Sequence, residues 1–357
     1  MINGRFLARP LTGVERYARE VITALDTKLD QLPNVVAPVT LLAPNGTKCD
    51  LPLKFITYAT RGNARGHFWE QTTLAVVARN SILINLCNSA PLFHPNNFVV
   101  FHDAAVYRYP GDFSVLYRYY HQILGVGLAR AASIGTVSSF SQRELAQTLN
   151  LDATSIPIIR NGSEHLASMK VAKLDAIAEI DLRETRFFLT VGTFSTRKNL
   201  DIVASALRRI DRHDFRVLVV GGTNKKIFGR ANISPDPRLV ILGRRSDAEL
   251  AALYRNAVGL VFPSRYEGFG IPPLEAFSLG CPVIAASGPT TREICADAAE
   301  FFDPDDANGL SKIMMERLNE HSVKANWAEM GIKQANRYRW SEAAESLWRQ
   351  MQILCSI

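Results

Sequence analysis

The sequence predicts an α/β protein with two doubly wound domains, each built on a parallel β-sheet. Three observations lead to this prediction: the length of 357 residues, the alternation of apolar runs with amphipathic segments, and a polar segment at 163–186 that separates two sets of five apolar runs. A single hydrophobic core stops growing at about 250–300 residues, so a chain of this length is expected to divide into domains. Alternating strands and helices form parallel sheets with right-handed crossovers.

The expected strands are short runs rich in β-branched and aromatic residues, which are typical of strands buried on both faces. They lie at 2–7, 39–43, 82–86, 98–101, 133–137, 187–191, 215–220, 239–242, 258–262 and 282–285. The expected helices between them lie at 13–29, 139–149, 200–210, 247–256 and 272–279. Because parallel sheets bind ligands beyond the carboxyl ends of their strands, we expect a ligand in a central cleft between the two domains.

The domain boundaries follow from the same pattern. The first domain is expected at 1–168 and the second at 169–339. A last helix at about 340–357 is expected to return and pack on the first domain.

Composition restricts the class of protein. The chain is 47% hydrophobic and 21% charged, which is ordinary for a soluble globular protein. Its five cysteines are scattered without a CxxC pair, so neither a disulfide framework nor a zinc site is expected, and a reducing cytosol fits. From the sequence we expect neither a membrane span nor a signal peptide. The net charge of +7 favours anionic partners such as a nucleotide, a diphosphate or a membrane surface, while no motif indicates nucleic-acid binding.

The segment 265–285, RYEGFGIPPLEAFSLGCPVIA, holds two carboxylates eight residues apart. It begins as a loop after a strand, and its two prolines are expected to start a helix. Gly268 and Gly270 let the backbone approach a ligand, and the amides of a helix start attract an anion. Glu275 can accept both hydrogen bonds of a vicinal diol such as a ribose, and Glu267 can reach hydroxyls beyond the phosphates. Stabilisation of the helix dipole, the alternative, explains Glu275 but neither Glu267 nor the glycines.

The segment from Glu267 to Glu275 resembles the Glu-x7-Glu motif of retaining glycosyltransferases of family 4, which have the GT-B fold of two Rossmann-like domains. Other segments resemble motifs of that family in the same order: LTGVERYARE (11–20), FHDAAVYRYP (101–110), TVSSFSQREL (136–145), NGSEH (161–165), TVGTFSTRKNL (190–200) and FFDPDD (301–306). GHFWEQ (66–71), NLCNSAPL (85–92) and HDAAVYRYP are most similar to the mannosyltransferase B branch, which builds polysaccharides from GDP-mannose.

The resemblance implies a retaining hexosyltransferase that moves mannose from GDP-mannose to a saccharide acceptor in exopolysaccharide or O-antigen synthesis. A UDP- or dTDP-sugar donor is one alternative, and a catalytically silent sugar-nucleotide-binding protein is another. No cofactor is expected besides the nucleotide-sugar substrate. No metal site is expected either, since Asp303 and Asp305 match an Asp-x-Asp pattern without a third ligand nearby.

By the same resemblance, three residues are expected to be catalytic. Lys198 neutralises the donor diphosphate, because an ammonium suits a leaving group that gains negative charge. His102 contacts the donor sugar, and Glu267 contacts the sugar being transferred. The substrate-binding candidates are Gly13, Asp103, Thr193, Arg197, Gly268, Phe269, Gly270, Ile271 and Glu275.

Some of these assignments have alternatives. Thr193 stands where the family pattern has Arg, and we expect Arg197 to take that place. Lys198 could be a solvated side chain at a helix start, His102 a structural histidine, and Gly13 a strand-to-helix turn.

Aromatic residues and arginines alternate in the segment 104–130: Tyr107, Arg108, Tyr109, Phe113, Tyr117, Arg118, Tyr119 and Tyr120. This combination suits an anionic membrane interface. The alternative is an amphipathic helix whose tyrosines face the core. The chain is basic, and the family that it resembles extends lipid-linked saccharides. We therefore expect a cytoplasmic protein, peripheral at the inner face of the cytoplasmic membrane, whose acceptor is a polyprenyl-diphosphate-linked sugar or a growing polysaccharide.

Overall fold

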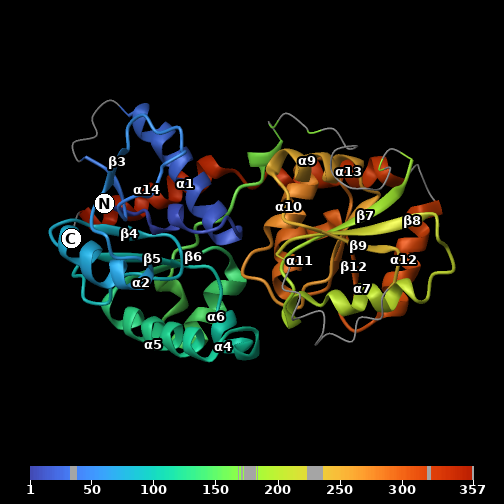
Figure 1. Ribbon diagram of the computed structural model, residues 1–357, viewed down its shortest axis with the longest axis horizontal. Helices are drawn as coiled ribbons and strands as arrows, with labels where there is room; N and C mark the ends of the chain where they lie inside the picture. Colours follow the sequence, from blue (N-terminus) through green and yellow to red (C-terminus); the bar gives the residue numbers. More distant parts are fainter. Residues whose placement is uncertain are drawn as a thin grey trace. The chain divides into compact units, whose positions relative to one another are not determined.

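The computed structural model describes residues 1–32, 38–167, 169, 172, 182, 184–222, 236–319 and 323–355. The chain divides into two compact units, which we call the N-terminal unit (Met1–Gly162 with Arg339–Ile357) and the C-terminal unit (Ser163–Tyr338). Each unit contains one six-stranded sheet with helices packed on it (Figure 1). Much of the segment expected to separate the domains, including residue 168, lies outside the described residues.

The N-terminal sheet is parallel throughout. Its strand order is β3 (Thr57–Thr60), β2 (Thr40–Ala43), β1 (Ile2–Asn3), β4 (Leu83–Asn85), β5 (Asn97–Phe101) and β6 (Ser133–Thr136). Its α-helices are α1 (Gly13–Asp30), α2 (Gly66–Trp69), α3 (Ala75–Val77), α4 (Ala105–Arg108), α5 (Val115–Ala131), α6 (Ser139–Leu149) and α14 (Trp340–Cys355). Glu70–Leu74 forms a π-helical turn between α2 and α3.

The C-terminal sheet is also parallel. Its strand order is β12 (Ala299–Phe302), β11 (Val283–Ala286), β10 (Gly259–Phe262), β7 (Arg186–Val191), β8 (Phe215–Val220) and β9 (Leu239–Gly243). Its described α-helices are α7 (Leu200–Leu207), α9 (Asp247–Asn256), α10 (Ile271–Ser278), α11 (Pro289–Cys295), α12 (Ala307–Asn319) and α13 (Val323–Ala335). Thr196–Lys198 forms a 3₁₀ turn before α7.

The two sheets share one topology. When the strands of each unit are numbered from its own first strand, both sheets have the order 3-2-1-4-5-6 of doubly wound nucleotide-binding folds. Each sheet has one edge strand, β3 or β12, that the sequence prediction missed. The strand expected at 2–7 is also corrected: only Ile2–Asn3 joins the sheet, and a 3₁₀ turn follows at Arg5–Ala8.

Amphipathic helices cover these sheets and complete the cores. In α1, the buried apolar side chains recur at helical spacing, and this stripe packs against α14. An ion pair between Lys28 and Glu345, at 2.6 Å, joins the two helices. In the C-terminal unit, Phe188 of β7 meets Phe215 of β8 edge to face, with ring centroids 6.0 Å apart. Among the described residues, no helix combines the length and the hydrophobicity that a membrane span requires.

Candidate active site

The loop between β10 and α10 is fixed by hydrogen bonds to its neighbours. The amide of Arg265 donates to the carbonyl of Arg197 at 2.8 Å, and the Thr290 hydroxyl donates to the carbonyl of Glu267 at 2.7 Å. Gly270 has φ +97°, in the left-handed region that favours glycine, and it is the N-cap of α10. The loop therefore presents its side chains from a defined backbone.

The first carboxylate, that of Glu267, is buried in a cationic cluster. It forms an ion pair with the Lys198 ammonium, and the Arg197 guanidinium lies 3.7 Å away. Burial opposes ionisation, but Lys198 and Arg197 more than offset this effect, so the pKa of Glu267 is lowered from its ordinary value. We call Lys198, Arg197 and Glu267 the cationic cluster.

The backbone around Lys198 brings it to the ends of the strands. Asn199, in the left-handed region at φ 53°, separates the 3₁₀ turn from α7 and donates to the carbonyl of Pro304 at 2.9 Å. Gly221 at the end of β8 lies so close to Gly192 that an added Cβ would be 1.7 Å from the Gly192 carbonyl oxygen. A pocket opens here, lined by Thr190, Val191, Gly192, Thr193, Phe194, Lys198, Leu200, Val219, Pro263 and Ser264.

The second carboxylate, that of Glu275 in α10, lies in a separate polar group. One oxygen is 2.9 Å from Nε2 of His165, and the other accepts from the Tyr254 hydroxyl at 2.9 Å. Burial and the neighbouring Glu275 charge raise the pKa of Tyr254, so this phenol remains a donor. Both oxygens of the Glu275 carboxylate are thus held by neighbouring side chains in a fixed orientation.

Neither His165 nor Tyr254 was among the residues selected from the sequence. His165 belongs to the quoted NGSEH segment, so a signal for it was present. Tyr254 lies on α9 in an ordinary amphipathic pattern, which gives no sign of a polar role.

The start of α10 has fewer free N–H groups for binding an anion than we expect from the sequence. Pro272 and Pro273 have no N–H, so an anion at this helix start depends on the amides of the preceding loop up to Ile271. Phe269 is buried and meets the Tyr338 ring edge to face at 5.8 Å, which indicates a packing role. Gly268 precedes it in the same buried loop.

The remaining candidates lie in the N-terminal unit. His102 is buried, its Nε2 lies 2.9 Å from the carbonyl of Leu86, and burial lowers its pKa. The ring is therefore neutral at neutral pH, with Nε2 donating and Nδ1 left as an acceptor. Asp103 accepts from the amide of Ala105 at 2.9 Å, at the start of α4. Gly13 is the exposed first residue of α1.

The FFDPDD segment is held by local contacts. Asp305 pairs with Arg265 at 2.5 Å, and its amide donates to Asp303 at 2.8 Å. Within the described residues, no group of three His, Cys, Asp or Glu side chains is arranged to hold a metal ion.

Comparison with known proteins gives a family model and curated relatives that include mannosyltransferases. Residues 175–334 match the family model described as Glycosyl transferases group 1. The chain is 27% identical to O-antigen chain mannosyltransferase B of Escherichia coli, over 67% of this chain and 66% of that protein. It is 25% identical to O-antigen chain mannosyltransferase RfbU of Salmonella typhimurium, over 86% of this chain and 87% of that protein.

Solved structures share the fold at low sequence identity. WaaG, a glycosyltransferase involved in lipopolysaccharide biosynthesis, matches with a TM-score of 0.70 and 15% identity over 97% of both chains. HepE of Anabaena, in complex with UDP and glucose, matches with a TM-score of 0.71 and 16% identity over 96% of both chains.

The chain has the GT-B fold of these solved structures, and it is similar to glycosyltransferases of group 1 over residues 175–334. Its resemblance to the mannosyltransferase type, predicted from the sequence motifs, is confirmed by the two O-antigen mannosyltransferases.

Proposed function

We propose that the protein is a retaining hexosyltransferase of family 4 that transfers mannose from GDP-mannose to a saccharide acceptor in bacterial polysaccharide synthesis. The observation that carries the proposal is the cationic cluster beside the loop that begins α10. Two cationic side chains face one carboxylate there, and the excess positive charge suits a nucleoside diphosphate. The names of the two curated mannosyltransferases support the sugar and the pathway.

In this proposal the two glutamates bind different parts of the donor. Glu275 accepts hydrogen bonds from the ribose hydroxyls while His165 and Tyr254 hold its carboxylate in place. Glu267 binds hydroxyls of the sugar being transferred, and Lys198 binds the diphosphate. Thr193 and Gly192 line the pocket beside Lys198, where the phosphates approach the backbone.

The proposed reaction retains the configuration of the donor sugar by same-face attack. An acceptor hydroxyl forms the new bond to the anomeric carbon on the face from which the nucleoside diphosphate leaves. The bond between the anomeric carbon and the phosphate oxygen breaks, and the departing phosphate takes the hydroxyl proton. Lys198 and the loop amides at 268–271 stabilise the charge that develops on the leaving group.

The donor is tested by titrating GDP-mannose and UDP-glucose while following the melting temperature. A ligand that binds only the folded state raises that temperature in a concentration-dependent way. We expect saturable stabilisation by GDP-mannose and a weaker effect of UDP-glucose. Stabilisation by UDP-glucose alone would refute the choice of donor while leaving the class of enzyme intact.

The proposed reaction needs no divalent metal and no cofactor, because Lys198 and the loop amides supply the positive charge. Transfer of sugar to the acceptor should therefore continue in EDTA. Loss of transfer that magnesium or manganese restores would contradict this part of the proposal.

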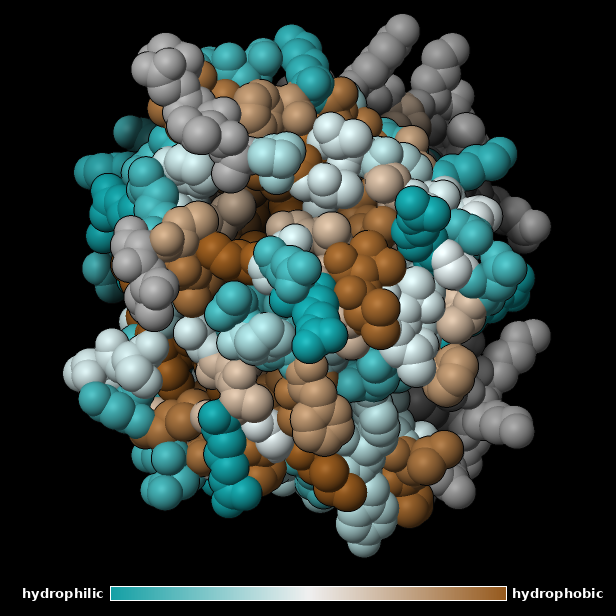
Figure 2. Space-filling model, turned by 90° about the vertical axis from the view of Figure 1, so that its left-hand side faces the viewer, coloured by the Kyte–Doolittle hydropathy of each residue, from teal (hydrophilic) through white to brown (hydrophobic). Residues whose placement is uncertain are grey.

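The acceptor is proposed to be a polyprenyl-diphosphate-linked saccharide, and the protein to act as a peripheral protein at the cytoplasmic face of an anionic membrane. Support comes from α5, where Leu116 is 82% and Ile123 70% exposed. Val115, Tyr119 and Val126 are further exposed apolar residues of this helix. Figure 2 shows how hydrophobic and hydrophilic side chains intermingle on one face of the molecule.

This membrane surface overlaps in part with the one predicted, since Tyr117 and Tyr119 are exposed while other residues of the predicted set are engaged within the unit. Tyr107 donates to the carbonyl of Gln122, Arg108 pairs with Glu144 at 2.7 Å, and Tyr120 packs against His67. These side chains therefore serve the fold of the N-terminal unit. The proposed contact with lipid is carried instead by the aliphatic residues of α5, with Arg118 stacked over Tyr119 at 4.7 Å.

A further inference from the structure

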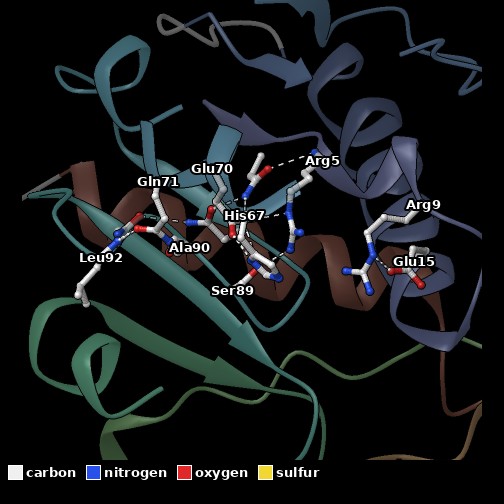
Figure 3. A network of polar contacts seen from close by, with 12 residues as sticks. Arg5, Arg9, Glu15, His67, Glu70, Gln71, Ser89, Ala90 and Leu92 are labelled. Atoms are coloured by element: carbon white, nitrogen blue, oxygen red, sulfur yellow. Dashed lines mark hydrogen bonds and ion pairs between the residues drawn. The ribbon is translucent and has the colours of Figure 1, made fainter. Parts of the chain in front are cut away.

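Two motifs of the N-terminal unit, GHFWEQ and NLCNSAPL, come together in one buried polar network (Figure 3). Gln71 of the first motif donates to the carbonyl of Ala90 at 2.9 Å and accepts from the amide of Leu92 at 2.9 Å. Ser89 of the second motif donates to Glu70 at 3.1 Å. These bonds fix the loop after β4 against the helix that carries His67 and Glu70.

The helix itself is irregular at this point. A π-helical turn begins at Glu70, directly after α2, and such turns occur frequently at functional sites. Trp69 anchors the turn, because its ring is buried and its Nε1 donates to the carbonyl of Arg61 at 2.7 Å. The turn is therefore held in place by contacts that do not involve His67.

Glu70 is fully buried, and both of its carboxylate oxygens are engaged. One oxygen accepts from Asn3 at 2.7 Å and from Ser89, with Arg5 3.3 Å away, and the other lies 3.1 Å from Nδ1 of His67. Burial opposes ionisation, but the hydrogen bond from His67 and the charge of Arg5 more than offset it, and the pKa of Glu70 is lowered. An ionised carboxylate can only accept, so Nδ1 of His67 is the donor in this pair.

This tautomer determines which ring nitrogen of His67 can accept a hydrogen bond. With its proton on Nδ1, the neutral ring has a lone pair on Nε2. No hydrogen-bond partner of that nitrogen is found among the described residues, and the side chain is 31% exposed. His67 therefore carries an oriented acceptor at the surface of the network.

Aromatic rings extend from His67 along α5. Its ring centroid lies 5.1 Å from that of His121, which lies 4.1 Å from that of Tyr117. Tyr117 stacks on Phe113 at 5.5 Å and is 41% exposed.

His121 supplies a second, independent observation. It is only 8% exposed, and its Nε2 has no hydrogen-bond partner within the part of the chain that the structure describes. Burial, followed by the charges of His67 and Arg5, lowers the pKa of His121 to about 4, so the ring is neutral at neutral pH. A buried ring nitrogen without a partner is costly, and it points to a polar ligand at this place.

The charges of the region are balanced. Arg5 pairs with Glu70, and Arg9 pairs with Glu15 at 3.1 Å (Figure 3). Without excess positive charge, the region suits neutral hydroxyl groups better than a phosphate. Aromatic rings beside hydrogen-bonding nitrogens also suit a sugar ring, which has an apolar face and hydroxyls at its edge.

We propose that His67, His121 and Tyr117 bind a neutral pyranose of the acceptor, with Nε2 of His67 accepting a hydrogen bond from one of its hydroxyls. Glu70 is a positioning residue, which fixes the His67 tautomer without touching the sugar. This inference rests on the proposed function, since it assigns the acceptor subsite of that transferase.

Two substitutions of His67 distinguish the role of its Nδ1 from the role of its Nε2. His67→Asn keeps a donor near the position of Nδ1, and so the bond to Glu70, but removes Nε2. His67→Gln keeps a polar group near the position of Nε2 and loses that bond. Thr72→Ala is the matched control, because it removes one exposed hydroxyl from the same π-helical turn.

The experiment is saturation-transfer NMR on the whole chain with methyl glycosides of mannose, glucose and N-acetylglucosamine, and with inorganic phosphate as a separate probe. We expect at least one pyranoside to bind the wild type and Thr72→Ala equally. His67→Asn should weaken its binding about three- to tenfold, the effect of one lost hydrogen bond. Tyr117→Ala, a change at an exposed side chain, should also weaken it, and His67→Gln should weaken it less than His67→Asn.

The inference is overturned if His67→Asn binds the pyranosides as the wild type does, if no pyranoside binds the wild type, or if only phosphate binds. Thermal stabilisation by GDP, measured on the same samples, reports the donor site and the folding of each variant. If GDP stabilises every variant and sugar binding is unchanged by the His67 substitutions, the assignment of the acceptor subsite is wrong and the proposed function stands. If GDP has no effect on the wild type, the proposed function itself fails.

Discussion

The N-terminal and C-terminal units have the same sheet topology but arrange their charges in opposite ways. In the C-terminal unit, Lys198 and Arg197 both pair with the carboxylate of Glu267. In the N-terminal unit, Arg5 and Glu70 form a pair surrounded by uncharged hydrogen-bonding groups. In folds of this topology the strand order fixes where ligands can bind, and the side chains around the strand ends determine which kind of ligand suits each unit.

The largest effect that follows from this comparison is on stability. Glu70→Ala leaves Arg5 buried without its partner, and breaking a buried pair in this way costs about 3–5 kcal/mol of unfolding free energy. Urea unfolding followed by far-UV circular dichroism measures it. Glu20→Ala, which removes an i,i+4 ion pair between partly buried side chains of α1, is the control and should cost less than Glu70→Ala. Equal losses of unfolding free energy in the two variants would contradict the larger contribution expected of the buried Arg5–Glu70 pair.

The next effect is on turnover. Lys198→Ala should lower kcat by about 10²–10³, since it removes a charge that stabilises the leaving group. Lys312→Ala, at an exposed position of α12, is the matched control and should leave kcat unchanged. Initial rates of nucleoside diphosphate release with donor and acceptor present give the comparison. A wild-type kcat in Lys198→Ala would remove Lys198 from the mechanism.

A smaller effect concerns pH. The lowered pKa of Glu267 means that its ionised form stabilises the folded state above the carboxyl's ordinary pKa, and that this contribution is lost as the pH falls through the lowered value. Glu267→Gln should therefore flatten the decline of stability in acid. Melting temperatures from pH 7 down to pH 3 provide the test. An equally steep decline in the variant would mean that Glu267 is not coupled to its cationic neighbours.

The smallest expected effect is on membrane binding. Leu116→Asp and Ile123→Asp should each reduce sedimentation with anionic vesicles about tenfold, because an inserted apolar side chain becomes charged. Ile332→Asp, an exposed isoleucine of α13, is the control. If the wild type does not sediment with these vesicles even at low salt, the membrane proposal fails and a soluble acceptor replaces it.

Much of the fold could be predicted because its central strands and amphipathic helices have strong periodicity. The bounds of β8, α6 and α9 are those predicted. The edge strands β3 and β12 were missed, since each is partly exposed and lacks a continuous apolar run. The strand expected at 2–7 ends early because the chain turns directly after Gly4 into the 3₁₀ turn Arg5–Ala8, where the amide of Leu7 donates back to the carbonyl of Gly4 at 3.0 Å.

The candidate site was only partly predictable, for a different reason. Glu267, Glu275 and Lys198 belong to motifs with characteristic spacing, so they could be selected from the sequence. The partners of Glu275, His165 and Tyr254, come from distant positions of the chain, and their contacts depend on tertiary packing. The outward face of α5 could not be chosen either, because tyrosines and aliphatic residues occupy both sides of that helix.

The central claim is that Glu267 binds the transferred sugar and Glu275 the nucleoside. Calorimetric titration of GDP and of GDP-mannose into Glu267→Ala and Glu275→Ala tests it directly. Glu275→Ala should weaken both ligands by about 1.5–3 kcal/mol, the value of hydrogen bonds to a charged group. Glu267→Ala should weaken GDP-mannose while leaving GDP within about 0.5 kcal/mol of the wild type. Equal losses of binding free energy for both ligands in both variants would contradict the claim that the two glutamates bind different parts of the donor.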